Sequence, residues 1–400
     1  MSSSSLSIGD IVDVTTERLA YGGDAVARHD GLAIFIPLAA PRERLRVRIT
    51  EHKKTFARAV IERVLAPSPS RREAPCEYFG VCGGCQLQHL SYEAQLESKT
   101  GFVRDALERI GRIDWPREIK IRHGAEFGYR GRAQLKMDRK TGRVGYNRAA
   151  SNGICDVVSC PILVPELDQA LQSLRSVVSN GANADLALSN RSQIEMAAGE
   201  TGVAFEPVFE GLPGGLLKRT VNGAAYSFSP STFFQANPGL LGELVDEAVG
   251  EASGDLAIDL YSGVGLFAIQ LARRFKNVIG VEADRNAARF AVENASANAI
   301  TNVQFQNAAA ELWLNKFIES KAPSPDVILL DPPRTGAAET IAQIAAISPA
   351  HVTYVSCDPA TMARDLRTLI DSGYELSRVT AIDLFPQTYH VETVALLTRH

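Results

Sequence analysis

One cysteine near the C-terminal end of the chain stands where a nucleophile would be expected. Ser356-Cys357-Asp358-Pro359 follows the apolar run 352–355, which indicates a buried strand. A helix is predicted to begin near Ala360, and its N-terminal dipole would lower the pKa of a neighbouring thiol. A lone cysteine is more often a small buried hydrophobe. The motif that begins at Asp331 favours the chemical role, because both loops would leave the sheet at one edge.

An acidic residue lies close to the end of the sequence. Glu392, in His390-Val391-Glu392, adjoins the apolar run 394–397. A carboxylate in apolar surroundings has a raised pKa and can accept a proton during a reaction. By itself, an acid on a terminal strand is more often an edge-strand charge than a catalytic base.

Glycines and acids at the ends of earlier strands indicate a nucleoside site. Asp259–Phe267 contains Gly263 and Gly265, which permit a tight turn and a close approach of the backbone to a ligand. Glu282 ends the next predicted strand and could accept both hydroxyls of a ribose, and Asn307 follows the strand after it. A phosphate-bearing cofactor would favour a fuller glycine loop. The pattern therefore favours a site for an adenosine without pyrophosphate, such as S-adenosylmethionine. The alternative is that each acid is only a helix cap or a surface charge, and the acids and glycines together favour the cofactor site.

A second group of cysteines has the spacing of a metal site. Cys76, Cys82 and Cys85 form a compact set, and Cys160, which precedes a proline, supplies a fourth thiolate. Clustered cysteines in a long chain without a secretion signal favour a metal over disulfides. A Cys-Pro pair occurs in iron–sulfur ligand runs, but four thiolates also suit zinc. The residues alone leave the metal open, and Cys155 is left over as a structural cysteine.

Charge and hydropathy limit the class of protein further. The net charge is −4, but Lys and Arg are concentrated between Arg117 and Arg148, where they could follow a phosphate backbone. A solvated hairpin face would explain the same stretch. No apolar run is long enough to span a bilayer, and residues 1–10 do not resemble a secretion signal. We therefore expect a cytoplasmic protein with no membrane partner.

Three segments with different patterning would position these residues. Residues 1–66 alternate apolar and polar positions between glycine turns, which predicts a small β-barrel. Residues 67–230 indicate a central α+β domain that carries the four-cysteine set. Its expected elements are helices over 92–110 and 165–179 and strands over 186–197 and 203–209. Residues 231–400 alternate apolar strands with helices, which predicts a doubly wound, mainly parallel sheet of the α/β class.

Several motifs together resemble those of the RNA 5-methyluridine methyltransferase family. They are, in chain order, Phe234–Asn237, Asp259–Phe267, Asp331–Arg334, Ser356–Pro359 with Arg364–Leu366, and His390–Thr393. The predicted barrel resembles the TRAM module found in many members. Leu266 and Asp358 stand where other members carry Asn, and the change at Leu266 removes one side-chain contact to the cofactor.

The resemblance implies a class I methyltransferase with a role for each motif. Cys357 would be the nucleophile and Glu392 the base. The cofactor S-adenosylmethionine would lie against Gln235, Tyr261, Glu282, Asn307 and Asp331. The set Cys76, Cys82, Cys85 and Cys160 matches the iron–sulfur branch of the family and implies a 4Fe–4S cluster. A barrel together with a cluster resembles the 23S ribosomal RNA branch, with transfer RNA as the alternative target.

The implied reaction needs both a thiol and a base. Carbon 5 of uracil is a poor nucleophile. Attack of a thiolate at carbon 6 produces an enolate, in which carbon 5 becomes nucleophilic and can take a methyl group. A base then removes the carbon 5 proton. The uridine must be flipped out of a stack or come from an unpaired loop. We expect a monomer that binds structured RNA and needs no obligate protein partner.

Three rival functions fit less well. An adenine amino methyltransferase needs no cysteine nucleophile, and an aromatic residue usually follows its two prolines, whereas Arg334 stands here. A cytosine carbon 5 enzyme usually has a proline before its cysteine, whereas Pro359 comes after Cys357. A non-catalytic, cluster-bearing RNA-binding protein would have no need of Cys357 and Glu392.

Overall fold

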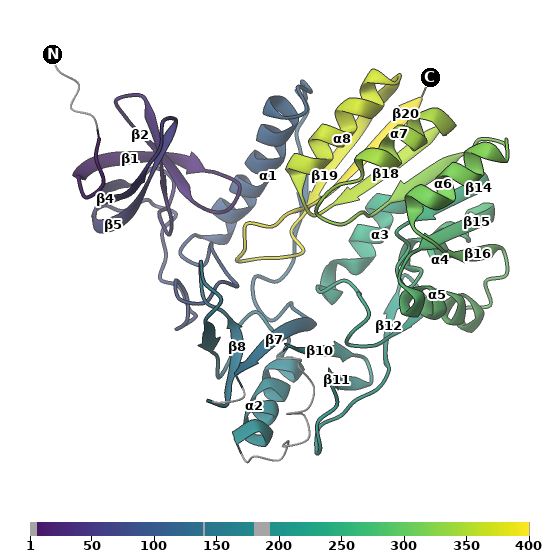
Figure 1. Cartoon of the computed structure of the whole chain (residues 1–400), viewed down its shortest axis with the longest axis horizontal. Coiled ribbons are helices and arrows are strands. Elements are labelled where there is room, and N and C mark those ends of the chain that lie inside the picture. The colour runs from purple at the N-terminus through teal and green to yellow at the C-terminus, as the bar shows by residue number, and fades with distance from the viewer. Residues whose placement is uncertain (1–5, 139–140, 180–192, 400) are drawn as a thin grey trace.

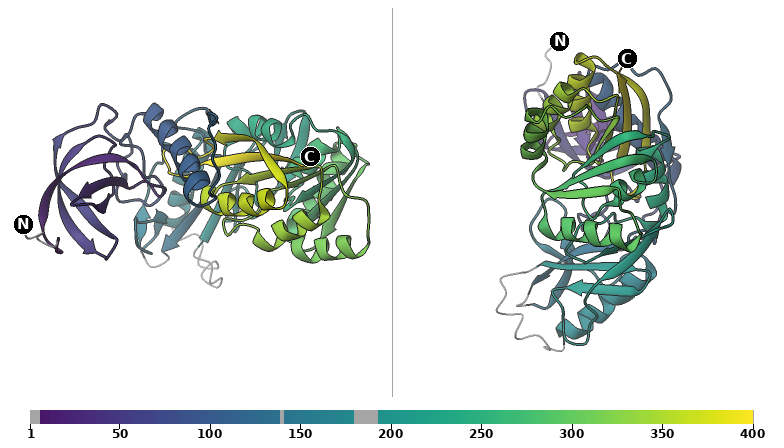
Figure 2. Two further views of the ribbon diagram at one scale, coloured as in Figure 1. Left: turned by 90° about the horizontal axis from the view of Figure 1, so that it is seen from above. Right: turned by 90° about the vertical axis from the view of Figure 1, so that its right-hand side faces the viewer.

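The computed structural model describes residues 6–138, 141–179 and 193–399. A small barrel lies at one end of the molecule and a large sheet covered by helices at the other, with helix α1 between them (Figure 1). Seen from above, the molecule is elongated, and the barrel is its N-terminal end (Figure 2).

Residues 11–66 form a closed five-stranded barrel of order β1-β2-β3-β5-β4, as the sequence predicts. The strands are β1 (Ile11–Leu19), β2 (Ala25–His29), β3 (Leu32–Ile36), β4 (Arg44–His52) and β5 (Phe56–Ala66). Alternate side chains of a strand face opposite sides. In β4 this places Leu45, Val47 and Ile49 in the buried interior and the arginines between them outside.

The middle of the chain combines two helices with short strands. They are α1 (Tyr92–Arg109), β6 (Lys120–Arg122), β7 (Arg132–Asp138), β8 (Arg143–Asn147), β9 (Ile154–Asp156), α2 (Pro165–Ser179), β10 (Gln193–Gly199), β11 (Gly202–Glu206), β12 (Leu217–Val221) and β13 (Ala224–Phe228). Strands β7 to β11 form one sheet of order β11-β10-β7-β8-β9, and β12 pairs with β13. The predicted strand 186–197 lies partly outside the described residues. The predicted strand 203–209 ends earlier, at Glu206, because Pro207 has no N–H to donate.

The C-terminal part is built on an eight-stranded sheet of order β16-β15-β14-β17-β18-β20-β19-β6. Its remaining elements are the 3-10 helix η2 (Pro238–Leu240), α3 (Leu241–Val249), β14 (Gly254–Leu260), α4 (Leu266–Leu271), β15 (Phe275–Glu282), α5 (Arg285–Ala297), β16 (Val303–Asn307), α6 (Ala310–Glu319), β17 (Val327–Leu330), α7 (Ala338–Ile347), β18 (His351–Ser356), α8 (Pro359–Asp371), β19 (Tyr374–Ile382) and β20 (Glu392–Arg399). β14 to β18 run parallel to one another, and β20 runs antiparallel to β18 and β19. The predicted doubly wound, mainly parallel sheet is confirmed.

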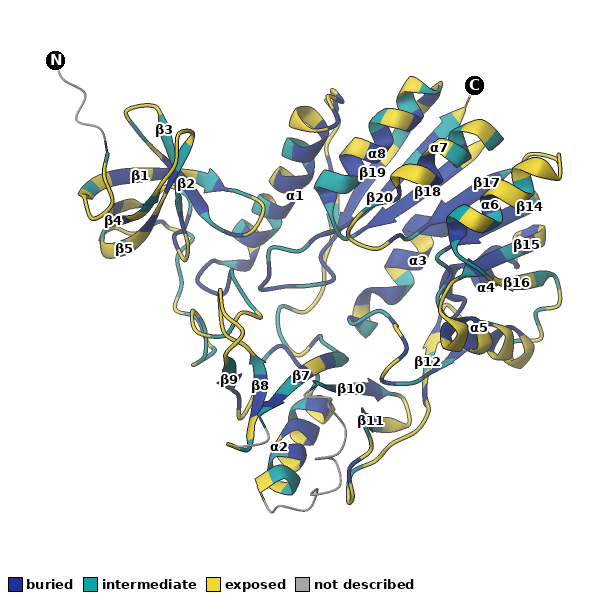
Figure 3. Cartoon of the chain, viewed as in Figure 1, coloured by how far each residue is buried: buried dark blue, intermediate teal, exposed yellow. Residues whose placement is uncertain are grey.

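Helices cover both faces of this sheet. Apolar residues of α3, α4 and α5 pack on one face, and those of α1, α6, α7 and α8 pack on the other. The strands between the two layers are buried, whereas the outer sides of the helices are exposed (Figure 3). All four residues of β17, Val327–Leu330, are buried, as expected for a central parallel strand with a continuous apolar run.

The barrel is fixed to the rest of the molecule by polar and apolar contacts. Leu87, Leu90 and Phe102, from outside the barrel, complete its apolar core. The fully buried Glu43 pairs with Arg71. Burial favours protonation of Glu43, but its hydrogen bonds with Arg71 and with backbone N–H groups win and hold its pKa below the usual value.

Candidate active site

Cys357, directly after β18, and Glu392, the first residue of β20, lie at the same edge of the sheet. In the antiparallel pair β18–β20, Ser356 lies opposite Thr393. One further step of this register sets Cys357 beside Glu392. Cys357 is a free, half-buried thiol, and Glu392 is buried. The strand pairing therefore brings together the two residues that the sequence predicts to act as nucleophile and base.

The surroundings of the thiol raise its pKa. Burial raises the pKa of Cys357 to about 11, with further contributions from the carboxylates of Glu392 and Asp331, while Arg334 opposes the shift. The expectation that the α8 dipole lowers this pKa is wrong. Asp358 caps α8 and accepts from the N–H groups of Ala360 at 2.9 Å and Thr361 at 3.0 Å, so a carboxylate already occupies the positive end of the helix.

Arg334 and His390 complete the immediate surroundings of the cysteine. A nitrogen of Arg334 lies 3.4 Å from Nε2 of His390. Burial, and then the charge of Arg334, lower the pKa of His390 to about 3, so the imidazole is neutral at physiological pH. Burial raises the pKa of Glu392 well above its usual value, Asp331 adds to the rise, and Arg334 opposes it. Arg334 is thus the cation that favours the charged forms of both Cys357 and Glu392.

Gln235 and Asp331, two predicted cofactor residues, meet at the same edge. Asp331 follows β17, and Gln235 approaches from the loop after β13. The amide of Gln235 donates to Asp331 at 3.3 Å. Burial raises the pKa of Asp331 to about 7. The structure therefore places one wall of the predicted cofactor site beside Cys357 and Glu392.

Glu282 and Asn307 order the glycine loop. One carboxylate oxygen of Glu282 accepts from the N–H of Gly263 at 2.8 Å, and the other accepts from Asp284 at 2.6 Å. Asn307 is exposed and donates to the carbonyls of Glu282 and Ala283. Its amide therefore holds the end of β15, and contact with an adenine stays a prediction.

Tyr261 lies at the start of the glycine loop with φ of 62°, a left-handed conformation that is uncommon for a large residue. Its hydroxyl lies 3.0 Å from the carboxylate of Glu311 and 2.9 Å from the hydroxyl of Thr340. These partners tie the loop to α6 and α7. Only the ring and backbone of Tyr261 are left to contact a cofactor.

Asp259 is a candidate that the sequence reasoning did not select. It is fully buried at the end of β14, and neither carboxylate oxygen has a hydrogen-bond partner. Burial raises its pKa far above the usual value, the nearby backbone N–H of Ala268 opposes the rise, and the charges of Asp331 and Glu282 add to it. A buried polar group without a partner is costly, which marks a place where a ligand would supply one. Its position as the first residue of Asp259–Phe267 was the available signal.

The four-cysteine set lines one cavity. Cys76, Cys82, Cys85 and Cys160 border a space of about 220 Å³, and Cys155 does not. All four are free thiols, and burial raises the pKa of Cys82 to about 11 and of Cys85 to about 12. Residues 76–85 and Cys160 thus come together from distant parts of the chain. Arg334 and His390 lie on the wall of the same cavity, so it adjoins the candidate active site.

Metal binding by these thiols stays a prediction. In residues 6–138, 141–179 and 193–399, no three His, Cys, Asp or Glu side chains are arranged to hold a single metal ion. The four thiols instead surround a volume. Four thiols are a donor set that suits either an iron–sulfur cluster or a zinc ion.

The basic stretch between Arg117 and Arg148 is partly used inside the protein. Arg122 pairs with Glu247, and Lys136 donates to Gln193. Arg148 is exposed, while residues 139–140 lie outside the described part of the chain. Both interpretations of the stretch therefore stay open.

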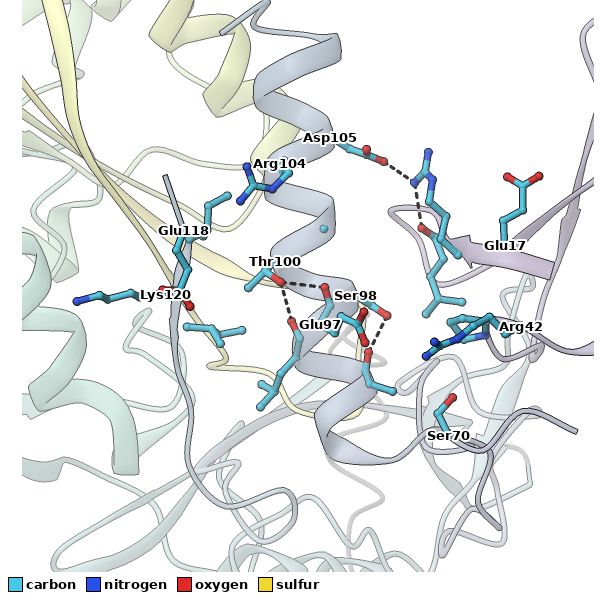
Figure 4. A pocket seen from close by; sticks show the side chains of 18 of the residues that line it. Glu17, Arg42, Ser70, Glu97, Ser98, Thr100, Arg104, Asp105, Glu118 and Lys120 are labelled. Atoms are coloured by element: carbon cyan, nitrogen blue, oxygen red, sulfur yellow. Dashed lines mark hydrogen bonds and ion pairs between the residues drawn. The ribbon is translucent and has the colours of Figure 1, made fainter. Parts of the chain in front are cut away.

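A cavity of about 870 Å³ lies between the barrel and α1 (Figure 4). Acidic residues such as Glu97 and Asp105 and basic residues such as Arg42 and Arg104 share its wall. None of the predicted catalytic, cofactor or cysteine residues lines this cavity. Its size alone therefore does not make it the candidate active site.

The sheet, the glycine loop and the buried carboxylates at the strand ends define an adenosine-binding methyltransferase fold. The structure of the Pyrococcus abyssi tRNA (uracil-54, C5)-methyltransferase in complex with S-adenosyl-L-homocysteine aligns with a TM-score of 0.74 and 25% identity, covering 97% of this chain and 100% of that one. Residues 217–400 match the tRNA (Uracil-5-)-methyltransferase family, and residues 6–61 match the TRAM domain.

Curated relatives match nearly the whole chain. The 23S rRNA (uracil(1939)-C(5))-methyltransferase RlmD of Cronobacter sakazakii is 34% identical over 98% of this chain and 96% of its own length. An uncharacterized RNA methyltransferase of Aquifex aeolicus is also 34% identical, over 96% of this chain and 97% of its own. The chain belongs to the RNA (uracil-5-)-methyltransferase family. It is therefore an S-adenosylmethionine-dependent enzyme that acts on RNA, as the motifs predict.

Proposed function

We propose that this enzyme methylates carbon 5 of a uridine in 23S ribosomal RNA. Relatives from Cronobacter sakazakii and Klebsiella pneumoniae that match nearly all of the chain are named for uracil 1939 of that RNA, which makes the equivalent uridine the first to test. Transfer RNA is the alternative, because the similar Pyrococcus abyssi structure is of a transfer RNA enzyme. The observation that carries the chemistry is the meeting of Cys357, Glu392 and Asp331 at one edge of the sheet.

In the proposed reaction, the thiolate of Cys357 forms a bond to carbon 6 of the uracil. S-adenosylmethionine, when bound, supplies the methyl group of its sulfonium to carbon 5; the bond between sulfur and methyl breaks, and S-adenosylhomocysteine is left. Glu392 then takes the carbon 5 proton, the double bond re-forms, and the bond between carbon 6 and Cys357 breaks. A buried carboxylate with a raised pKa is a stronger base than an exposed one, which suits Glu392 to this step.

The charge of the site supports a cationic ligand. The charges of Asp331 and Glu282 raise the pKa of Asp259, and Asp331 also raises the pKa of Glu392. Several carboxylates in one buried place disfavour ionisation unless a cation is present. S-adenosylmethionine brings a sulfonium and an ammonium. We infer that Gln235, Tyr261, Glu282, Asn307 and Asp331 form its site, with Asp259 added as a partner for one cationic group.

We infer that Cys76, Cys82, Cys85 and Cys160 hold a 4Fe–4S cluster. The support is the four free thiols that surround one cavity. The cluster would join residues 76–85 to Cys160, and its role would be structural or to face the RNA.

The wider organisation is also a proposal. We assign residues 1–66 to a TRAM-like RNA-binding barrel, 67–230 to a central iron–sulfur and RNA-binding domain, and 231–400 to the methyltransferase domain. We further propose a monomeric, cytoplasmic enzyme. No described helix is long and apolar enough to cross a membrane.

The decisive test is to map methylated uridines in a strain that lacks the gene. The strain is complemented with the wild type or with Cys357→Ala, and 23S ribosomal RNA and transfer RNA are digested and analysed by mass spectrometry. We expect one 5-methyluridine of 23S RNA to disappear and to return only with the wild type. Loss from transfer RNA instead would overturn the ribosomal target, and its return with Cys357→Ala would overturn the mechanism.

A further inference from the structure

The turn between β1 and β2 carries an aromatic residue from the barrel to the candidate active site. The N–H of Ala20 donates to the carbonyl of Asp24 at 2.8 Å, and Gly23 donates back to Ala20 at 3.0 Å, which closes the turn around Tyr21. Gly23 has φ of 95°, and a Cβ there would lie 3.0 Å from Cβ of Gln86. The turn therefore rests closely against the segment that holds the cysteine set.

Tyr21 contacts the backbone of the predicted nucleophile. Its hydroxyl donates to the carbonyl oxygen of Cys357 at 3.4 Å, which is long for an O–H···O bond. Hydrogen bonds of active sites are often long without substrate and shorten in the reacting complex. This contact joins the first hairpin of the barrel to the loop after β18, two segments that are far apart in the sequence.

Two other rings fix the position of Tyr21. The Tyr21 ring packs edge-on against Phe102 of α1, with centroids 5.9 Å apart, and against Tyr389, with centroids 5.2 Å apart. The ring centroids of Tyr389 and His390 are in turn 4.2 Å apart, and His390 belongs to the loop that leads to Glu392. Tyr21 therefore touches both the loop of Cys357 and the loop that precedes Glu392.

Tyr21 is not needed merely to attach the barrel. That attachment already has the apolar contacts of Leu87, Leu90 and Phe102 and the buried pair of Glu43 with Arg71. Tyr21 keeps 38% of its surface exposed, so it adds less buried surface to the attachment than these residues do. Its ring thus borders solvent directly beside Cys357. Asp358, Tyr389 and Cys357 are also the groups whose charges influence the Tyr21 hydroxyl most.

We propose that Tyr21 is a positioning residue for methylation, which holds the Cys357 loop in its reactive geometry from the barrel. The inference rests on the proposed role of Cys357 as nucleophile. It links the docking of the barrel to the chemistry, because the turn that places Tyr21 belongs to β1 and β2. Loss of the hydroxyl should slow bond formation at carbon 6 without weakening the binding of either substrate.

The test compares Tyr21→Phe with Tyr374→Phe. Tyr374 makes the same kind of bond, from its hydroxyl to the carbonyl of Pro349 at 2.8 Å, but on β19 and away from the cysteine. With a 23S ribosomal RNA transcript, we expect Tyr21→Phe to lower kcat about 3- to 10-fold, the size of one modest hydrogen bond. KM for RNA and for S-adenosylmethionine should change less than twofold, and Tyr374→Phe should keep the wild-type kcat.

A second measurement isolates the formation of the bond between Cys357 and carbon 6. Uridines of the transcript are replaced by 5-fluorouridine, whose fluorine cannot be removed by the base, so the bond between Cys357 and carbon 6 persists after methyl transfer. The rate of formation of this adduct in a single turnover should fall by the same factor in Tyr21→Phe and further in Tyr21→Ala. An unchanged adduct rate, or an effect confined to KM for RNA, overturns the inference. Absence of an adduct with the wild-type enzyme overturns the proposed function itself.

Discussion

The chemistry proposed for this enzyme depends on how a few charged groups share one buried place. Cys357 and Glu392 both have raised pKa values in the ligand-free chain, and Arg334 is the cation that opposes both rises. A further positive charge in the site would therefore favour the ionised forms of both groups. The sulfonium of the methyl donor would bring that charge, so binding of the donor should prepare both the nucleophile and the base.

This reasoning predicts how the reactivity of Cys357 depends on pH. Iodoacetamide reacts with the thiolate, so alkylation of Cys357 in the ligand-free enzyme should rise with pH towards a midpoint near 11. A nearby cation favours the charged form of an acidic group, and an Arg beside an Asp lowers the carboxyl pKa by about 1–3. Bound S-adenosylmethionine should therefore move the midpoint to lower pH than bound S-adenosylhomocysteine, which lacks the sulfonium charge. Mass spectrometry of the Cys357 peptide measures this, and equal midpoints with the two ligands would contradict the electrostatic argument.

A change of the base should stop the reaction after the methyl transfer. Glu392→Gln keeps the shape of the side chain but accepts no proton, so the methylated uracil should stay bound to Cys357. We expect a protein–RNA adduct that survives denaturing electrophoresis, with turnover reduced at least a hundredfold. The matched control is Cys357→Ala/Glu392→Gln, which should bind RNA but form no adduct. Normal turnover by Glu392→Gln would assign the base to another residue.

At the scale of elements, the antiparallel strand β20 does what a parallel strand could not do. It brings the start of one strand, Glu392, beside the end of another, β18, and so places two catalytic candidates together. The loop from Asp383 to Val391 that leads into β20 is held from α1. The ammonium of Lys99 pairs with Asp383 and donates to the carbonyl of Phe385 at 2.9 Å.

The Lys99–Asp383 pair should be important for stability. Both side chains are fully buried, so Lys99→Met would leave the charge of Asp383 in an apolar interior without a partner. Such losses cost about 3–5 kcal/mol, whereas replacing both partners is often close to neutral. We expect Lys99→Met to lower the free energy of unfolding in urea by that amount and Lys99→Met/Asp383→Leu to recover most of it. The exposed Lys120→Met should change little, and a small effect of Lys99→Met would show that the pair is dispensable.

At the scale of the whole molecule, the active site draws on all three parts of the chain. The large sheet supplies Cys357 and Glu392, the barrel supplies Tyr21, and the four-cysteine cavity shares Arg334 and His390 with the site. A cluster in that cavity would hold residues 76–85 to Cys160 and thereby fix the wall beside the catalytic loop.

The metal content tests this arrangement. Protein purified without oxygen should contain about four iron atoms and four sulfides per chain, measured by elemental analysis and by absorption of visible light. Cys82→Ser should lose the iron and melt at a lower temperature, but should still bind S-adenosylmethionine, because its site is built on other strands. Cys155→Ser, outside the cavity, is the matched control and should retain iron. Zinc in place of iron would refute the cluster.

The sequence by itself determined the barrel, the doubly wound sheet and the candidate residues at its strand ends. Apolar periodicity fixes which segments become strands and helices, and the ends of parallel strands must meet at one edge. The tertiary structure decided what depends on contacts between distant segments: the entry of β6 into the sheet, the approach of Tyr21 to Cys357 across 336 residues, and the raised pKa of that thiol. No local pattern encodes these features, because burial and charge at a site are set by every part of the chain that packs around it.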